Sequence, residues 1–256
     1  MDWHIAIPSY KRSEIIQSKT LAVLERYDIP PEQVTIFVAS QEEYETYSDA
    51  IKGIQIIVAL PGLAAARNFI MDYFPVGKRI LFMDDDIEKF IERTDEGTKV
   101  ELESFTEMVD MGFAKAKQVN CCLWGLSAVP NPFFMKRTIS THLKFIIGSC
   151  FGMINPGSSG DGGIHLDFSE KEDYLRTLLC YERDGAVVRI NYVSPVTKYY
   201  KHGGGMQTNA NRVKDQETAV EYLVDRWPLL VHINSRRRSQ YPEVLLRGPR
   251  LKTQNR

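Results

Sequence analysis

Cysteines are few in this sequence, and their spacing excludes the usual metal-binding pairs. The four cysteines are Cys121, Cys122, Cys150 and Cys180, with no C-x-x-C spacing among them. The one adjacent pair, Cys121 and Cys122, cannot easily bind a single metal ion. We therefore expect four reduced thiols in the core, which indicates a reducing compartment.

Long hydrophobic runs and a targeting segment are also missing. No apolar run approaches the 18 residues typical of a membrane-spanning helix. The chain starts Met1-Asp-Trp-His, which places an acid where a signal peptide has basic residues. The composition, with 43% hydrophobic and 25% charged residues, is ordinary for a globular protein of 256 residues. The sequence thus predicts a cytoplasmic protein with no membrane partner.

A strong overall charge is missing too, but the charges are unevenly distributed. The net charge is −1, yet residues 234–256 hold seven basic side chains and one acid. The preceding 233 residues are correspondingly acidic. Two interpretations fit a basic tail on an acidic body: a contact with a polyanion, and a solvated terminus with incidental charge.

Strand-like and helix-like segments alternate through the first half, which predicts an α/β fold. Apolar strand patterns at 5–7, 35–39, 54–58 and 80–83 are separated by helical patterns at 13–27, 41–47 and 62–74. This order is typical of a Rossmann-like, parallel or mixed sheet with helices on both faces.

The second half is less regular. Helical patterns at 104–117, 169–184 and 214–226 alternate with strand patterns at 122–126, 144–154 and 187–193. Ser169 and Glu172 have the spacing of a capping box at the start of the middle helix. We expect a single domain over residues 1–233, with halves 1–90 and 91–233, followed by the basic tail 234–256.

Three consecutive carboxylates follow the apolar run 80–83. A strand there places Asp84, Asp85 and Asp86 at the edge where open α/β sheets bind ligands. On an extended backbone Asp84 and Asp86 share a face, while Asp85 points the other way and should tolerate substitution best. The D-x-D pair suits Mg²⁺ or Mn²⁺ together with a phosphate-bearing substrate. The alternative interpretation is a solvated turn.

Seven short strings follow one another along the chain. They are Ile7-Pro-Ser-Tyr-Lys-Arg12, Phe37-Val-Ala-Ser40, Pro61-Gly-Leu-Ala-Ala-Ala-Arg-Asn68, the acidic triplet, Leu123-Trp-Gly125, Glu172-Asp173 and Lys198-Tyr-Tyr-Lys201. In this order they resemble the family 2-like glycosyltransferases of the GT-A fold, and most closely the TET/JBP-associated glycosyltransferases of phages and bacteria. The resemblance extends from residue 5 to about residue 207. It implies transfer of a sugar from a UDP-sugar to a 5-hydroxymethylpyrimidine in DNA, 5-hydroxymethylcytosine in particular.

In such a transferase, the first strand end forms the pocket for the donor base. Pro8, Ser9 and Tyr10 lie there, together with Ala39 after the second strand, and Tyr10 can stack on the base. The guanidinium of Arg12 can donate two hydrogen bonds to a phosphate or a uracil oxygen. The alternative interpretation of this strand end is a plain β-α turn without a binding role.

The resemblance places the donor diphosphate and its metal near the acidic triplet. Asp86 is expected to bind the metal directly, and Asp84 to hold the ribose or a metal-bound water, with Asp85 also in the donor site. Arg67 is expected to reach the donor phosphates or Asp84. A salt bridge that pins the loop is an equally good interpretation of Arg67.

Two later segments complete the expected site. In similar enzymes a C-terminal histidine completes the metal shell, and His202 matches it, flanked by Lys198 and Lys201 in a glycine-rich loop that could close over the donor. A surface histidine is the alternative. Asp173 matches the base that accepts the acceptor proton in inverting enzymes, although helix-dipole compensation also favours acids in a first turn.

The acceptor side is expected to be aromatic and basic. Trp124, Gly125 and the segment 145–151 are candidates to line the acceptor site, with core packing as the alternative. Arg236, Arg237 and Arg238 are expected to hold a DNA backbone. Two other functions stay open: a GT-A glycosyltransferase acting on a saccharide, lipid or protein, and a nucleic-acid-binding module with a decayed catalytic site.

Overall fold

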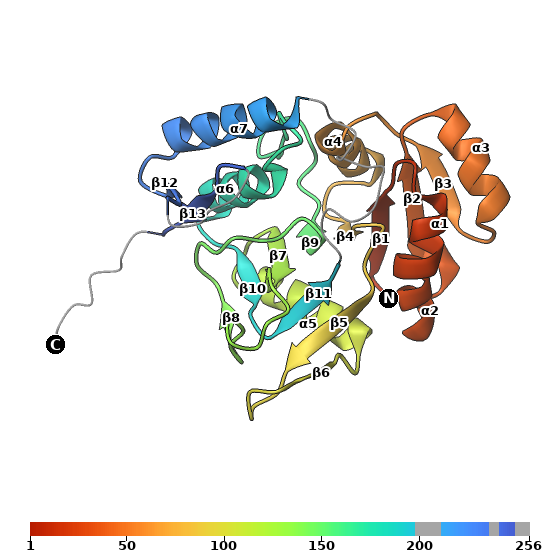
Figure 1. Ribbon diagram of the computed structural model, residues 1–256, viewed down its shortest axis with the longest axis horizontal. Coiled ribbons are helices and arrows are strands. Elements are labelled where there is room, and N and C mark those ends of the chain that lie inside the picture. The colour runs from red at the N-terminus through yellow and green to blue at the C-terminus, as the bar shows by residue number, and fades with distance from the viewer. Residues whose placement is uncertain (198–210, 236–240, 249–256) are drawn as a thin grey trace.

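A computed structural model of the chain describes residues 1–197, 211–235 and 241–248 (Figure 1). Strands and helices alternate as the sequence predicts over the first half. The strands are β1 (Trp3–Pro8), β2 (Val34–Val38), β3 (Gln55–Val58), β4 (Arg79–Met83), β5 (Lys89–Arg93), β6 (Lys99–Glu101), β7 (Leu123–Leu126), β8 (Ile139–Ser140), β9 (Cys150–Ile154), β10 (Val188–Ile190), β11 (Val193–Val196), β12 (Val231–Ile233) and β13 (Val244–Leu246).

Helices form several of the connections between these strands. Between β1 and β2 the chain forms α1 (Ser13–Ile16), the π-helical turn η1 (Gln17–Leu21), α2 (Ala22–Arg26) and the 3₁₀ turn η2 (Pro31–Gln33). The remaining helices are α3 (Gln41–Ala50), α4 (Leu63–Tyr73), α5 (Phe105–Gln118), α6 (Glu172–Asp184) and α7 (Arg212–Arg226).

The central sheet has eight strands in the order β3-β2-β1-β4-β9-β7-β10-β8. Strands β3, β2, β1 and β4 are parallel, β9 runs antiparallel between β4 and β7, and β7 is parallel to β10. Because β4 and β7 both oppose β9, they point the same way and end at the same edge. The expected α/β fold with a mixed sheet is confirmed.

Each face of this sheet has its own hydrophobic core. On one face, Ile5 and Leu81 pack with residues of α2 and α5, such as Val23 and Val109. On the other face, residues of α4, α6 and α7 pack on the neighbouring positions of the same strands. Alternate side chains of a strand thus enter opposite cores, and helices cover both faces (Figure 1).

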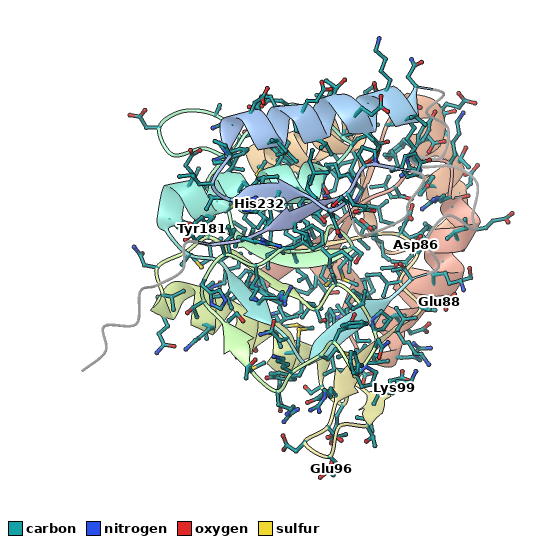
Figure 2. The ribbon with its side chains drawn as sticks, turned by 60° about the vertical axis from the view of Figure 1, so that its left-hand side comes forward. Asp86, Glu88, Glu96, Lys99, Tyr181 and His232 are labelled. Atoms are coloured by element: carbon teal, nitrogen blue, oxygen red, sulfur yellow. The ribbon has the colours of Figure 1, made fainter. Side chains whose placement is uncertain are left out.

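Two small antiparallel units complete the fold. Strands β11, β5 and β6 form a three-stranded sheet, and β12 pairs with β13. Figure 2 shows Glu96 and Lys99 at the far end of the β5–β6 hairpin, which projects from the body of the protein. Strand β13 lies within the segment predicted as a tail, and it returns to the body through a hydrogen bond from Tyr174 Oη to the Val244 carbonyl of 3.2 Å.

Three predicted elements differ in the structure. The predicted helix 13–27 contains the π-helical turn η1, and the predicted strand 187–193 divides into β10 and β11 in different sheets. Of the predicted strand 144–154, only β9 is extended. Ile146 N donates to Thr177 Oγ1 at 3.3 Å, so the residues before β9 pack against α6 rather than joining a ladder.

The predicted capping box is wrong. Helix α6 begins at Glu172, after Lys171 adopts a left-handed conformation with φ of 59°. The Ser169 hydroxyl instead accepts a hydrogen bond of 3.1 Å from Ala64 N in the first turn of α4. Ser169 therefore caps a helix that lies 105 residues earlier in the chain, which no local sequence pattern could indicate.

Two expectations from composition can be compared with the structure. All four cysteines are buried and free, which confirms the predicted core thiols. None of the helices within the described ranges has the length and apolar composition needed to cross a membrane.

Candidate functional site

The candidate site lies where the parallel strands end. Strands β1, β2 and β4 are in parallel register, so Pro8, Ala39 and Asp84 leave the sheet along the same edge. Ligands of open α/β sheets bind outside these carboxyl ends, because the connecting loops and helix starts converge there. The structure thus brings the predicted donor residues Pro8, Ala39 and Asp84 to one edge of the sheet.

The acidic triplet forms a tight turn rather than an extension of β4. The Thr20 hydroxyl donates to the Asp84 carbonyl at 2.7 Å and accepts from Ile87 N at 3.0 Å, so it bridges the two ends of the turn. Thr20 is completely buried and belongs to the π-helical turn η1. π-turns often occur at functional sites, and here the turn places this hydroxyl between the two ends of the acidic turn.

Asp85 is the most buried of the three carboxylates, which overturns the prediction that it would tolerate substitution best. Its oxygens accept hydrogen bonds from Ser9 Oγ at 2.6 Å and Arg12 Nη1 at 2.9 Å. Burial raises the pKa of Asp85, while Arg12 and Ser9 oppose that rise. The alternation expected of a strand fails because Asp85 and Asp86 lie in a turn.

Arg12 and Ser9 connect this turn to the first strand and to α3. The Ser9 hydroxyl lies 2.8 Å from Tyr47 Oη, which accepts from Arg12 N at 2.9 Å. The Arg12 guanidinium also lies 3.5 Å from Asp86. Ser9 and Arg12 therefore hold the acidic turn, while their neighbour Tyr10 is partly exposed at this strand end.

Asp84 is the carboxylate best placed to meet a ligand. The pKa of Asp84 is raised to about 8: desolvation raises it most, Arg67 lowers it, and Asp86 and Asp85 raise it. Its side chain is nevertheless 36% exposed, so a dissolved cation can reach it. A raised carboxylate pKa means that Arg67 compensates the negative charge here only in part, and a divalent cation would supply the rest.

The pair Asp84 and Asp86 therefore fits a divalent cation, but it supplies only part of the ligands that such a cation needs. Asp84 and Asp86 offer hard carboxylate oxygens, which Mg²⁺ and Mn²⁺ prefer. Figure 2 shows Asp86 beside the first helices. Among the side chains that the structure describes, no group of three or more His, Cys, Asp or Glu converges on a metal position. This pair would need further ligands from water, substrate phosphates or the remaining part of the chain.

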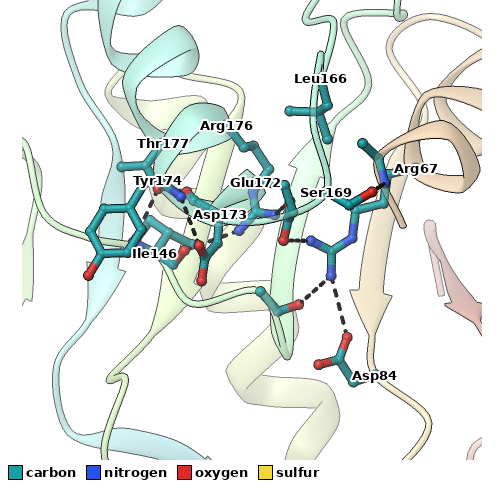
Figure 3. Close-up of polar contacts among 12 residues, drawn as sticks. Arg67, Asp84, Ile146, Leu166, Ser169, Glu172, Asp173, Tyr174, Arg176 and Thr177 are labelled. Carbon is teal, nitrogen blue, oxygen red and sulfur yellow. Dashed lines mark hydrogen bonds and ion pairs between the residues drawn. The ribbon is translucent and has the colours of Figure 1, made fainter. Parts of the chain in front are cut away.

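A buried network of ion pairs joins Asp84 to α6 (Figure 3). Arg67 on α4 donates to a Glu172 oxygen, to the Gly148 carbonyl at 2.9 Å and to Asp84 at 3.4 Å. Arg176 donates to the second Glu172 oxygen at 2.8 Å. Burial alone would raise the pKa of Glu172, but Arg176 and Arg67 outweigh it and the pKa is lowered.

The two arginines of this network also lie against an aromatic ring of β9. The guanidinium of Arg176 lies 3.6 Å from the centroid of Phe151, and that of Arg67 lies 5.2 Å from it. Gly148 allows the side chain of Glu172 to approach the backbone closely, because a Cβ at position 148 would lie 2.8 Å from Glu172 Oε1. The network is thus fixed by packing as well as by charge.

Asp173 follows Glu172 directly but has a different role in the structure. One of its oxygens accepts from Tyr174 N at 3.0 Å, and its side chain is partly exposed. The pKa of Asp173 is raised to about 6, because burial and then Glu172 raise it by more than Arg176 and Arg67 lower it. At neutral pH Asp173 is therefore ionised, with a basicity greater than that of an ordinary aspartate.

Trp124 does not line an acceptor site, so this prediction is wrong. Its side chain is fully buried between Gly112 of α5 and Gly152 of β9, where any Cβ would overlap the indole. Gly125 is equally closed by Ile146. Core packing, the alternative left open by the sequence, explains both residues.

The segment 145–151 is divided between the core and the site. Phe151 is buried and stacks on Phe82, with ring centroids 4.7 Å apart. Phe145 is partly exposed and stacks on Tyr174, beside Asp173, at a centroid distance of 4.2 Å. Of this segment, Phe145 is the residue that stays available to an acceptor.

Several predicted residues lie outside the described part of the chain. They are Lys198, Lys201, His202, Arg236, Arg237 and Arg238.

The sequence interpretation missed three side chains that hold the site together. The role of Arg176 could have been suspected, because its i,i+4 spacing from Glu172 is typical of a helical ion pair. Thr20 and Tyr47 had no such signal, since their partners are Asp84 and Ser9 in distant parts of the sequence.

Comparisons with known proteins agree with the architecture. No family model matches the sequence, and no curated protein does. Among solved structures, TarS of S. aureus (residues 1–349) superposes with a TM-score of 0.50 and 13% identity, over 90% of this chain and 72% of that one. The mannosyltransferase PcManGT of Pyrobaculum calidifontis, solved with GDP-Man and Mn²⁺, has a TM-score of 0.52 and 12% identity, over 89% of this chain and 64% of that one. The chain thus has a GT-A-like fold, a mixed α/β architecture around an eight-stranded sheet.

Proposed function

We propose that this chain is a metal-dependent glycosyltransferase that moves a sugar from a nucleotide sugar to an acceptor hydroxyl. The observation that carries the proposal is the Arg67–Glu172 bridge, which links Asp84 at the end of β4 to the helix that bears Asp173. One rigid connection thus ties a candidate cation site to a candidate base, at the ligand-binding edge of a GT-A-like sheet.

The donor half of the site is suited to a nucleoside diphosphate sugar, for which we propose UDP as the nucleotide. Asp84 and Asp86 would hold Mn²⁺ or Mg²⁺, which supplies positive charge to the departing diphosphate. Ser9 and Arg12 hold the acidic turn in shape, so the oxygens of Asp84 and Asp86 are positioned before the donor arrives. His202, Lys198 and Lys201 are proposed to complete this side.

The acceptor half needs a group that takes a proton. The acceptor hydroxyl oxygen forms the new bond to the anomeric carbon of the sugar, while the bond from that carbon to the diphosphate breaks. Asp173 accepts the hydroxyl proton as the oxygen attacks, because it is ionised at neutral pH and more basic than an ordinary aspartate. Attack opposite the leaving diphosphate inverts the anomeric configuration.

For the acceptor, we propose a 5-hydroxymethylpyrimidine in DNA. The ordered motifs resembling the TET/JBP-associated glycosyltransferases and the basic residues of 234–256 support this acceptor. The second candidate is a saccharide, lipid or protein acceptor. The likeness to a mannosyltransferase solved with GDP-Man favours the second candidate and adds GDP-mannose to the donors worth testing.

Mass spectrometry can test both acceptors in one design. The protein is incubated with Mn²⁺, a panel of UDP-sugars and GDP-mannose, and DNA containing 5-hydroxymethylcytosine or 5-hydroxymethyluracil. Parallel reactions contain free sugars. The DNA is digested, and the nucleosides are weighed. A nucleoside heavier by one hexose supports the proposal, while transfer only to a free sugar moves the conclusion to the second candidate.

A matched pair of variants shows whether any transfer depends on the proposed base. Asp173→Asn should remove most of the activity, whereas Asp161→Asn, which changes an exposed carboxylate, should retain it. Absence of transfer from every donor to every acceptor would refute the proposed function.

A further inference from the structure

Two exposed aromatic side chains lie on the loop between β7 and β8. Phe133 is 84% exposed and Phe134 is 63% exposed, with ring centroids 5.1 Å apart and planes at 90°. Asn131 fixes their turn, because its side chain accepts from Phe133 N at 3.0 Å and its carbonyl from Phe134 N at 2.9 Å. Met135 follows in the core and anchors the turn. The fold thus presents two large apolar rings to solvent on a structured support.

This loop leaves the sheet at the edge that carries the acidic triplet. In the sheet register, Gly125 of β7 and Phe82 of β4 both lie opposite Phe151 of β9. Strand β7 therefore ends level with β4, and the chain turns from it into the aromatic pair. The exposed rings belong to the ligand-binding edge rather than to the opposite end of the molecule.

Basic side chains surround the return of this loop to the sheet. Lys136 N donates to the Asn191 carbonyl at 3.1 Å, and Arg189 Nε donates to the Asn191 side chain at 2.7 Å. Arg189 Nη1 also donates to the Phe145 carbonyl at 3.3 Å, next to Lys144. Lys136, Arg189 and Lys144 thus converge on one small region between β8, β10 and the start of segment 145–151.

The charges of this cluster are not neutralised by nearby acids. Within residues 1–197, 211–235 and 241–248, no Asp or Glu forms an ion pair with Lys136, Lys144 or Arg189. Burial lowers the pKa of Lys144, and Arg189 and Lys136 lower it further. The pKa of His142 is also lowered, first by burial and then by Lys144 and Arg189. Uncompensated cations held together in this way favour an anionic ligand.

The cluster leads back to the proposed base. Tyr174, which follows Asp173, stacks on Phe145, and the Phe145 carbonyl holds Arg189. Contacts therefore run without interruption from Asp173 through Phe145 and Arg189 to Lys136, which lies two residues from Phe134. These contacts connect the cluster to the proposed base at one end and to the loop of the aromatic pair at the other.

We propose that Phe133, Phe134, Lys136, Lys144 and Arg189 form a binding track for single-stranded nucleic acid that leads to Asp173. Exposed rings stack on bases of any sequence, and a line of cations follows the phosphates. A duplex keeps its bases stacked on each other, so it cannot use the rings in this way. This inference deepens the acceptor half of the proposed function, on which it rests for the destination of the strand.

Fluorescence anisotropy with a labelled oligothymidylate of about 20 nucleotides tests the track, at several NaCl concentrations and beside a duplex of equal length. Phe133→Ala/Phe134→Ala should weaken oligothymidylate binding about tenfold or more, with little change in salt dependence. Lys136→Gln/Lys144→Gln should reduce the slope of log K against log salt by about 1.4. The control variants are Leu229→Ala, which alters another side chain exposed to 84%, and Lys52→Gln, and both should bind normally.

Each result separates the track from the enzyme activity. Binding within twofold of the wild type in both double variants overturns the track, and sugar transfer by the wild type to DNA would still support the proposed function. Equal losses for duplex and single strand, with no effect of the phenylalanines, also overturn it, because they indicate a general polyanion contact. Selective loss of single-strand binding, with no transfer from any donor, supports the track and refutes the proposed function.

Discussion

Glu172→Gln removes one negative charge from a buried network without changing the size of the side chain. Glu172 is 4% exposed and accepts hydrogen bonds from two arginines that are themselves almost completely buried. After the substitution Arg67 keeps Asp84 at 3.4 Å, whereas Arg176 keeps the Ile146 carbonyl, the face of Phe151 and at most a neutral amide oxygen in place of the carboxylate. A buried guanidinium is therefore left without its counter-ion.

The expected loss of stability follows from that missing charge. Breaking a buried ion pair by removing one partner costs about 3 to 5 kcal/mol, because the remaining charge stays desolvated. With an m-value of about 3 kcal/mol/M, the urea midpoint should fall by about 1 to 2 M. The Tm should fall by roughly 6 to 20 °C in a protein of this size.

Urea unfolding followed by circular dichroism measures this loss, with Glu182→Gln as the matched control. Glu182 lies on the same helix, but its ion pair with Arg226 is at the surface, where the side chain of Glu182 is 52% exposed. That control should change stability by less than about 1 kcal/mol. Adding Arg176→Met to Glu172→Gln should recover part of the loss, because the uncompensated cation is removed as well.

The pH dependence provides a second check, and its sign is fixed by the pKa. The arginines lower the pKa of Glu172 in the folded protein, so its contribution is complete above the ordinary glutamate pKa of about 4.3. That contribution is lost as the pH falls further, through the lowered folded value. The stability difference between wild type and Glu172→Gln should therefore narrow in acid. A urea midpoint within about 0.3 M of the wild type at pH 7 would refute the reasoning.

Three further predictions concern the chemistry and the packing of the site. Asp173→Asn should lower kcat by about 10² to 10⁴ without changing donor affinity. Wild-type kcat/KM should fall tenfold per pH unit below about 6, because Asp173 must be deprotonated to act as the base. In steady-state kinetics, normal turnover of the variant or a flat wild-type profile to pH 5 would contradict the role of Asp173 as the base. Asp86→Ala should abolish Mn²⁺-dependent UDP binding in calorimetry, and retained binding would reject Asp86 as a metal ligand. Gly148→Ala should cost about 1 to 3 kcal/mol in urea unfolding, since its Cβ would lie 2.8 Å from Glu172; unchanged stability would show that the network yields easily.

Strand pairing was predictable where local patterns and topology agree. Apolar runs of four or five residues separated by helical periodicity specify parallel strands, and parallel strands carry their carboxyl ends to one edge. Asp84 and Pro8 could therefore be placed at one edge of the sheet from the sequence. The short hairpin β5–β6 and the ribbon β12–β13 gave no comparable signal, because β6, β12 and β13 have only three residues each, which is too short to show a period.

Side-chain partners across long separations were not predictable. Arg67 and Glu172 are 105 residues apart, and Ser9 and Asp85 are 76 apart. The sequence shows that such charges exist, but only the packing of α4 against α6 brings the first pair together. Trp124 shows the same limit, because a tryptophan beside glycine is compatible with a ligand site and with the tight core contact that the structure shows.

The sequence by itself determined that an acidic triplet would follow a buried strand at the ligand-binding edge of a mixed α/β sheet. It could do so because strand formation depends on the residues of the strand itself and on the period of their burial. Tertiary structure alone decided how the triplet is divided: a turn bridged by Thr20 buries Asp85 and leaves Asp84 open to solvent. The division depends on desolvation and on charges brought from distant segments, and neither quantity exists before the chain has folded.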